Sequence, residues 1–511
     1  MKKWISLALV LALLLVGCGK QPAAKEEKPT PSENDTMIED FDDTEETYDG
    51  VKIQLSDDGI TVDGEVISAD AEAAVYAAND IVYYESGKDF TYGEGDEKDA
   101  HTKEEADAHT VVHIAKAGQY VLSGKLSKGQ IAVDLGKDAE EDPNAVVTLV
   151  LNGLDITCEV APAVIFYNVY ECGSDDEETA TKDVDLTAAG ARVIIANNSE
   201  NKVNGSYVAR IYKPGTVELT EDGTAVADAK KLHKYDAAFY SKKSMRIQGG
   251  NKGNGNGKLF IKAANEGLDS ELHLTIDGGI IDIESGNDGI NTNEDNMSVT
   301  TINDGRLSIV VNGSTGEGDG IDSNGWLVIN GGIVVAQACG FSADAGIDSD
   351  KGIHINGGTV IASGNMLDRI ESGGQVYATY SGNRSNTESV ITLKDKDGDV
   401  VYTTTIVNAY SMLLVSSPVM KEEGYAVWAG DTQLQAGTGQ DGFGPGGMGG
   451  MRPPQGGFGE RPDFPEGMEP PEGMEPPEDG FGGRPSFPEG MEPPEGGGGD
   501  MPSFDGDNSP I

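Results

Sequence analysis

The stretch Gly318-Asp-Gly-Ile-Asp-Ser323, followed by Trp326-Leu-Val-Ile-Asn-Gly-Gly-Ile-Val-Val335, contains the unit from which this sequence is built. Its first phrase is Gly, then Ile or Leu, then Asp or Asn, then Ser or Thr. Its second phrase is a short apolar run interrupted by paired turn residues. The first phrase recurs at Asn265–Ser270, Asn287–Thr292 and Asp344–Ser349, and the second recurs at Leu274–Ile283, Val299–Ile309 and Ile353–Ile361. Repetition at this period is typical of solenoids and other repeat architectures.

The spacing of the copies predicts their structure. The glycine of the first phrase and the glycine of the following turn are 12 residues apart in three copies and 16 in the fourth. A degenerate fifth copy has Ala238 in place of the first glycine, with Gly250 again 12 residues later. Successive copies begin 29, 22, 31 and 26 residues apart, which suits a coil of two or three short strands.

Within each first phrase an apolar residue lies between polar ones, the alternation of a strand with one buried face. We therefore expect an all-β fold, a right-handed parallel β-helix over residues 51–437 with its own C-terminal cap. An antiparallel sandwich is the alternative, since Asn-Gly pairs also form hairpin turns. Unequal coils with one fixed internal spacing favour the β-helix.

The two ends of the chain have a different composition. Lys2 and Lys3 precede an apolar stretch that ends in Leu15-Val-Gly-Cys18, which resembles a bacterial lipobox. We expect residues 1–17 to be a lipoprotein signal peptide and Cys18 to be lipidated, anchoring the protein outside the cell membrane. Residues 18–50 are acidic and poor in apolar side chains, and residues 438–511 are rich in Gly, Pro, Met and Glu. We expect both segments to be disordered, as a spacer and a tail.

Charge limits the range of partners. The chain has 37 basic and 87 acidic residues, a formal net charge of −50. Nucleic acid is excluded as a partner because its recognition requires a basic surface. An anionic ligand requires a bridging cation. In an oxidising extracytoplasmic location, Cys158 and Cys172 could form a disulfide.

Stacking of the repeats would place acidic side chains in columns. Equivalent positions of neighbouring coils lie about 4.8 Å apart, and stacked carboxylates at that distance repel one another. Hard cations with oxygen ligands relieve such repulsion, and Ca²⁺ accepts six to eight oxygens in a loose geometry. The alternative is that these side chains are solvated turn and strand-end residues. The residues expected to bind calcium are Asp269, Asp288, Asn291, Asp319, Asp322, Asp344, Asp348 and Asp350.

Several of these phrases carry a family resemblance over residues 51–430. They are Asp288-Gly-Ile-Asn291, Asp319-Gly-Ile-Asp322, Gly346-Ile-Asp348, Ala117-Gly-Gln-Tyr-Val-Leu-Ser-Gly124 and Leu151-Asn-Gly-Leu-Asp-Ile156. Together with the Ile-Asn-Gly-Gly turns they resemble a family of bacterial surface lipoproteins that bind carbohydrate through a pectate-lyase-like β-helix. The resemblance implies bound calcium and a plant-type polysaccharide ligand such as cellulose or polygalacturonate. Ala345 and Ala238 depart from the pattern and make calcium at their coils less secure.

The function that these patterns favour is noncatalytic, calcium-dependent polysaccharide binding at the cell surface. Exposed aromatic rings stack on sugar faces, and Trp326 and Tyr240 are the candidates, although both could equally be core residues. A calcium-activated lyase would need a basic side chain as proton acceptor, and an adhesion or structural protein would need neither site. The candidate bases are Lys242, Lys243, Arg246, Arg306 and Lys351.

Overall fold

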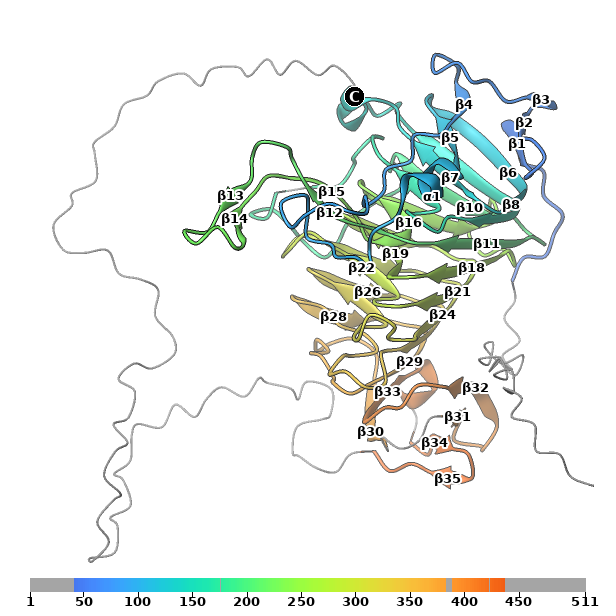
Figure 1. Cartoon of the computed structure of the whole chain (residues 1–511). Helices are drawn as coiled ribbons and strands as arrows, with labels where there is room; N and C mark the ends of the chain where they lie inside the picture. The colour runs from blue at the N-terminus through green and yellow to red at the C-terminus, as the bar shows by residue number, and fades with distance from the viewer. Residues whose placement is uncertain (1–40, 175, 383–387, 422, 437–511) are drawn as a thin grey trace, which may run out of the picture. The chain divides into compact units, whose positions relative to one another are not determined.

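The structure is a computed structural model that describes residues 41–174, 176–382, 388–421 and 423–436. These residues are mostly β-strand, and the strands stack in long parallel sheets (Figure 1). Within these ranges, no helix combines the length and apolar character needed to traverse a lipid bilayer. The expected signal peptide, Cys18 and the tail 438–511 lie outside the described residues.

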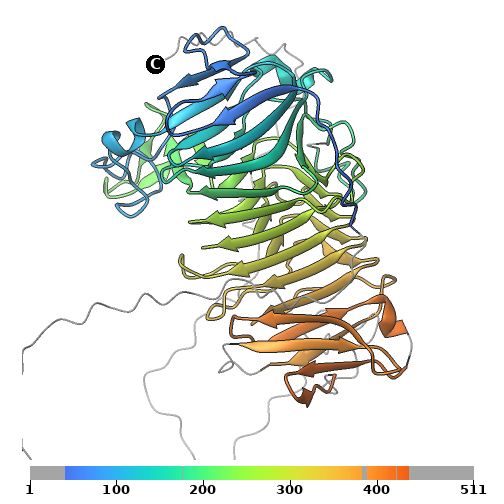
Figure 2. The same cartoon turned by 90° about the vertical axis from the view of Figure 1, so that its right-hand side faces the viewer.

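The repeated unit forms one coil of three strands. The coil that begins with β19 (Glu266–Ser270) continues through β20 (His273–Ile276) and β21 (Ile280–Ser285). Each strand pairs in parallel with its counterpart in the next coil, and Figure 2 shows the coils stacked in chain order. This is the arrangement expected of a β-helix-like fold, and the parallel pairing is inconsistent with the antiparallel sandwich.

Two sheets contain the coils. The first strand of each coil belongs to an eight-stranded sheet of β4 (Val75–Ala78), β5 (Thr110–Ile114), β7 (Gly129–Val133), β9 (Val164–Phe166), β16 (Ala237–Ser241), β19, β22 (Ile290–Thr292) and β25 (Ile321–Ser323).

The other two strands of each coil form two ladders that the long strands β6 and β8 join into one 19-stranded sheet. Besides β20 and β21 it contains β1 (Val51–Leu55), β2 (Thr61–Val62), β3 (Glu65–Val66), β6 (Gly118–Leu126), β8 (Val147–Thr157), β10 (Ala191–Ile195), β11 (Glu200–Gly205), β17 (Met245–Gly249), β18 (Lys258–Ala263), β23 (Val299–Ile302), β24 (Arg306–Val311), β26 (Trp326–Ile329), β27 (Ile333–Gln337), β28 (Gly352–Ile355), β29 (Thr359–Gly364), β30 (Tyr377–Ser381) and β33 (Met412–Ser416).

The core lies inside the coils and is built from the apolar position of the repeat. Leu268, Ile290 and Ile321 are each fully buried and are paired in register across β19, β22 and β25. The glycine before this position is required because coils approach closely there: a Cβ on Gly289 would lie 2.6 Å from the carbonyl oxygen of Gly320. The turn glycine has another role, since Gly332 has φ +74°, which favours glycine.

Different elements close the two ends of the stack. At the N-terminal end β4 pairs with β5 in antiparallel orientation, and at the C-terminal end β33 does the same with β29. A four-stranded antiparallel sheet follows at the position of the expected cap, and it shares a second apolar cluster with residues of β27 and β29. Its strands are β31 (Ser389–Lys394), β32 (Val400–Ile406), β34 (Ala426–Ala429) and β35 (Thr432–Gln433).

Shorter elements interrupt or extend the coils. An insertion after β11 forms two antiparallel pairs, β12 (Val208–Tyr212) with β15 (Lys231–Tyr235), and β13 (Glu218–Leu219) with β14 (Val226–Asp228). The described helices are short: α1 (Lys103–Asp107) and the 3-10 helices Lys137–Glu141 and Pro418–Lys421.

The structure corrects two expectations. Residues 41–50 of the expected spacer pack on the coils: the Asp42 amide donates to the Asn254 carbonyl at 2.9 Å, and the Asp42 carboxylate pairs with Lys252 at 2.5 Å. The disulfide between Cys158 and Cys172 is not formed, since both are free. Cys158 is buried in the core, whereas Cys172 is half-buried with its thiol directed at the Asp185 carbonyl, and a disulfide needs the two side chains to face each other at short range.

Candidate functional site

The acidic positions of the repeat form a column on the eight-stranded sheet. Asp269 pairs in register with Asn291, and Asn291 with Asp322. The Ile321–Ile347 bridge continues this register and places Asp348 next in line. Because successive residues of a strand face opposite sides, this column lies outside the coils while the apolar position beside it lies inside. We call Asp269, Asn291, Asp322 and Asp348, with Glu266, Asp288 and Asp319 beside them, the acidic column.

Part of the acidic column has a structural role between coils. The Asp288 carboxylate accepts a hydrogen bond from the Asp319 amide at 2.7 Å, and the Asp319 carboxylate accepts one from the Ala345 amide at 2.5 Å. Asp344 acts similarly, since it accepts from the Gly318 amide at 2.7 Å. Asp288 and Asp319 thus help to hold the following coil, and Asp344 helps to hold the preceding one.

The side chains at one end of the acidic column are enclosed. Glu266 is 4% exposed and Asp269 is 0% exposed. Burial is the main reason that the pKa of each is well above its usual range, and neighbouring carboxylates raise it further. Lys234 opposes this effect for both groups and forms an ion pair with Asp236. We call Asp236, Glu266 and Asp269 the covered end.

The other end of the acidic column is half-buried and contains only acidic groups. Burial and then the charge of Asp288 raise the pKa of Asp319 to about 9. Burial and then Asp350 raise the pKa of Asp322 to about 6. Burial and then Asp368, which hydrogen-bonds to it, raise the pKa of Asp348 to about 7. We call Asp319, Asp322 and Asp348 the open end; none of them forms an ion pair with a Lys or Arg within the described ranges.

The structure also adds residues that the repeat did not reveal. Asp368 follows β29, outside any copy of the phrase, and accepts a hydrogen bond from the Ser349 amide at 3.1 Å. Asp350, which the sequence did predict, is exposed, and its pKa is raised by partial burial, by Asp295 and by Asp368. Lys234 and Asp236 belong to the insertion after β11. Their only sequence signal is their position just before the degenerate copy at Ala238.

The donor set of the acidic column fits a hard cation. It consists of oxygens, and two of them, Glu266 Oε2 and Asn291 Oδ1, are buried with no hydrogen-bond partner among the residues described. Carboxylate and amide oxygens are the ligands that Ca²⁺ prefers. Among the residues that the structure describes, no three His, Cys, Asp or Glu side chains converge as a metal centre. The carboxylates are instead distributed along the column, so any ion here would require oxygens from more than one coil.

The two aromatic candidates lie in different places. The structure corrects the prediction that Tyr240 binds sugar. Tyr240 is 1% exposed, its hydroxyl donates to Glu271, and its ring packs edge-on against Tyr235, with ring centroids 5.3 Å apart. The insertion that brings Tyr235 covers it, so it cannot stack on a sugar. Trp326 is half-buried at the start of β26, just after β25 of the acidic column, with the Lys351 ammonium 4.9 Å from its ring centroid.

Three of the candidate bases are held in ion pairs. Lys243 contacts Glu140 at 2.5 Å, Arg246 contacts Asp277 at 2.5 Å and Arg306 contacts Asp282 at 3.9 Å. This arrangement agrees with their interpretation as residues that balance nearby carboxylates.

A polar groove of about 390 Å³ runs along the other sheet, beside residues 182–187. Its floor includes Arg246 and an asparagine ladder in which Asn356 donates to Asn330 and Asn330 to Asn303, each at 2.8 Å. Asn303 in turn donates to Asp277 at 2.7 Å. These are the Asp and Asn residues of the second phrase, and their mutual hydrogen bonds join successive coils.

Long parallel sheets, with a column of oxygen donors on one of them, define a β-helix-like fold. The model of the family described as "Carbohydrate-binding domain-containing protein" matches residues 108–415, and the chain belongs to this family. No curated protein matches the chain. Among solved structures it is similar to one described as "Structure of the polysaccharide lyase-like protein from C. thermocellum, Gadolinium derivative", with 19% identity, 62% of this chain and 90% of that chain covered, and a TM-score of 0.35.

Proposed function

We propose that this protein is a noncatalytic, calcium-dependent polysaccharide-binding lipoprotein. It is anchored outside the bacterial membrane through Cys18 and binds its ligand on a right-handed parallel β-helix. Membership of a carbohydrate-binding family supports the ligand class. The observation that carries the calcium dependence is the open end, where Asp319, Asp322 and Asp348 are stacked without a basic partner in the described structure.

The open end and its surroundings would hold the cation. Asp322 and Asp348 are the principal candidates, because they are neighbours in register and both are half-buried. Asp288, Asp319, Asn291, Asp344 and Asp350 surround them, and Asp269 lies at the covered end. Calcium, when bound, supplies positive charge and coordination positions for the carboxylate oxygens of an acidic sugar.

The chain's own residues then determine what can approach. With a net charge of −50, the surface repels a polyanion except where its carboxylates are neutralised. Hydrogen bonds from the backbone to Asp288 and Asp319 fix the column between coils, so the site is preorganised on rigid strands. Trp326, which follows β25, is the aromatic residue available beside the open end.

Retention on insoluble polysaccharide tests the proposal. We expect the full-length protein to be retained on polygalacturonate in calcium and released by a chelator. The double variant Asp322→Asn with Asp348→Asn should lose retention at least tenfold. The matched control is Asp58→Asn, an exposed carboxylate in the N-terminal region.

Two outcomes would favour the alternatives. Release of unsaturated product that absorbs in the near ultraviolet would indicate a calcium-activated lyase. Calcium-dependent stability without retention on any glycan would indicate an adhesion or structural protein and would overturn polysaccharide binding.

A further inference from the structure

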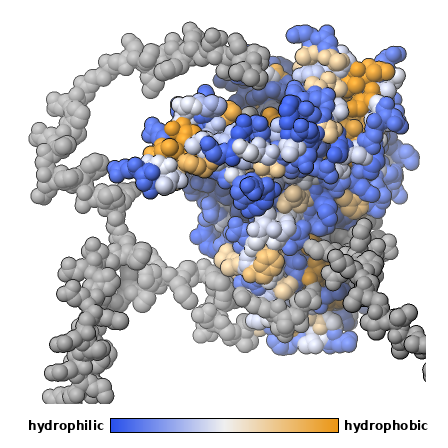
Figure 3. Space-filling view, viewed as in Figure 1, coloured by the Kyte–Doolittle hydropathy of each residue, from blue (hydrophilic) through white to orange (hydrophobic). Residues whose placement is uncertain are grey.

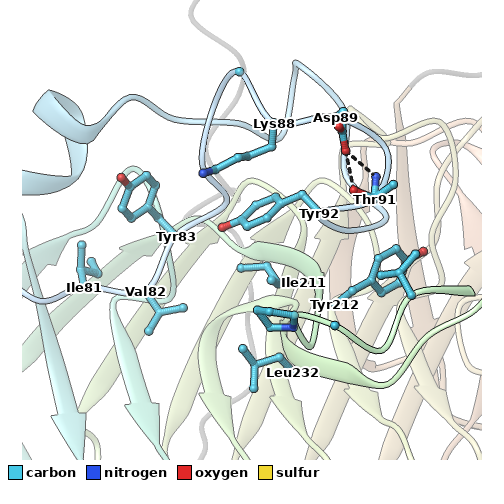
Figure 4. Close-up of a pocket in the computed structure, with 14 residues that line it drawn as sticks. Ile81, Val82, Tyr83, Lys88, Asp89, Thr91, Tyr92, Ile211, Tyr212 and Leu232 are labelled. Carbon is cyan, nitrogen blue, oxygen red and sulfur yellow. Dashed lines mark hydrogen bonds between the residues drawn. The ribbon is translucent and has the colours of Figure 1, made fainter. Parts of the chain in front are cut away.

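A second cavity, far richer in aromatic side chains, lies between residues 81–92 and the hairpin of β12 and β15 (Figure 4). Its volume is about 700 Å³, within the range of small-molecule sites. Three half-buried tyrosines, Tyr83, Tyr92 and Tyr212, line it, and Ile211 and Leu232 lie below Tyr92 in this view. We call it the tyrosine pocket.

The tyrosine pocket is held together by backbone contacts between two insertions. The Tyr212 amide donates to the Tyr92 carbonyl at 2.9 Å, and the Glu94 amide donates to the Arg210 carbonyl at 2.8 Å. Gly93 allows this approach, since a Cβ there would lie 2.3 Å from the Arg210 carbonyl oxygen. Tyr92 is further fixed by edge-on packing against buried Tyr84, with ring centroids 5.1 Å apart. The rings are therefore preorganised rather than carried on free loops.

The polarity of the tyrosine pocket differs from that of the acidic column. The charged side chains in its lining are Lys88 and Asp89, which balance each other. Lys88 pairs with Glu85 at 3.0 Å and lies 5.4 Å from the Tyr92 ring centroid, and Asp89 accepts hydrogen bonds from Thr91. The hydroxyls of Tyr83 and Tyr212 make no hydrogen bond within the described residues. The pocket thus offers flat apolar faces with polar edges and little net charge.

Exposed apolar side chains extend this surface. Phe90 is 48% exposed, Leu232 is 47% exposed and Leu219 is 46% exposed, on the same two insertions that build the pocket. Figure 3 shows hydrophobic surface at the insertion that carries β13 and β14. Exposed apolar surface beside a pocket is typical of a binding site, and aromatic faces with polar edges suit the C–H faces and hydroxyls of a sugar.

We propose that the tyrosine pocket binds a neutral sugar chain, for which cellohexaose is the probe, and that this binding does not require calcium. The inference rests on the proposed function insofar as the ligand is a polysaccharide, but it assigns a different site and a ligand of different charge. An acidic polymer is disfavoured here because no cluster of oxygen donors could hold a bridging cation in this lining.

Binding of soluble cellohexaose to the full-length protein, measured calorimetrically in chelator, tests this assignment. We expect Tyr92→Ala and Tyr212→Ala each to weaken binding about tenfold through the loss of one ring contact. Tyr212→Phe, which keeps the ring, should weaken it less than threefold. Phe341→Ala removes an aromatic side chain that is 70% exposed in another coil and should have no effect. Thermal unfolding of each variant separates loss of the site from loss of the fold.

The outcomes distinguish this inference from the proposed function. Calcium-dependent retention on polygalacturonate together with no cellohexaose binding would overturn the tyrosine pocket alone. Cellohexaose binding that survives both alanine substitutions in folded protein would overturn it as well. Cellohexaose binding could instead be lost in the double variant Asp322→Asn with Asp348→Asn and kept in the tyrosine variants. That result would place both cellohexaose and polygalacturonate at the acidic column and overturn the tyrosine pocket.

Discussion

The covered and open ends of the acidic column are made from the same repeated phrase, but only the covered end has a basic side chain beside its carboxyl groups. At the covered end, Asp236, Glu266 and Asp269 are buried near Lys234, a fixed positive charge supplied by the chain. At the open end, Asp319, Asp322 and Asp348 are half-buried among further carboxylates. Buried charge is costly unless it is paired, so a column without a lysine must be relieved by protons or by a diffusible cation. The comparison therefore separates a structural end from an end available for function.

The largest expected effect comes from removing the fixed charge of the covered end. Lys234→Met should lower the free energy of unfolding by about 3 kcal/mol, because it leaves the buried Asp236 without its ion-pair partner. We expect a loss at the lower limit of the range for buried ion pairs because the Lys234 side chain is 33% exposed. Urea unfolding in saturating calcium measures it.

Lys98→Met is the matched control, since this side chain is 76% exposed and pairs with exposed Asp96. We expect a change below about 0.5 kcal/mol. Equal effects of the two substitutions would show that Lys234 does not stabilise the covered end.

The next effect concerns the cation at the open end. A ligand that binds only the folded state stabilises it by about 2.7 kcal/mol at 100 times its dissociation constant, so calcium should raise the melting temperature of the natural protein. Asp322→Asn with Asp348→Asn should abolish most of this gain. Lys234→Met should keep it, which would separate the two ends; loss of the gain in Lys234→Met instead would place the cation at the covered end.

Stability in chelator should also depend on pH. Asp322 and Asp348 have folded-state pKa values of about 6 and about 7, above the ordinary 3.8. Such carboxyls bind protons more tightly in the folded chain, so stability is higher at low pH and falls as pH rises from about 4 through these values. We expect these two groups to lose about 1.5 kcal/mol between pH 5 and pH 8, limited by solvent screening at half-buried groups, and Asp319, with a pKa of about 9, adds to the fall in the same direction. Calcium should remove this loss, and stability that rises over the same interval would contradict the electrostatic account.

The parts of the molecule that the sequence predicts are those that repeat. The pairing of Asp269 with Asn291 and of Asn291 with Asp322, and the burial of Ile290 and Ile321, follow from one phrase and its spacing. A column is the stacking of equivalent positions, so a repeat determines its members without any knowledge of side-chain contacts.

The parts that the sequence does not predict come from segments inserted between repeats. Lys234 and Tyr235 arrive on the insertion after β11, and they turn the predicted sugar-facing Tyr240 into a core residue. The tyrosine pocket joins residues 81–92 to β12, more than a hundred residues apart in the sequence. No period relates such segments, and their contacts are fixed by the tertiary fold alone.

The smallest expected effect is at Asp350, which marks the outer limit of the open end. Asp350 is exposed, so solvent screens its charge and its contribution to any bound cation is weak. Asp350→Asn should lower calcium affinity less than threefold and change the free energy of unfolding by less than about 0.5 kcal/mol. Calcium titration followed by thermal unfolding measures both, with Asp322→Asn as the comparison. If Asp350→Asn weakened calcium binding as much as Asp322→Asn does, the cation would lie at the exposed rim of the column, and burial would not be what creates the site.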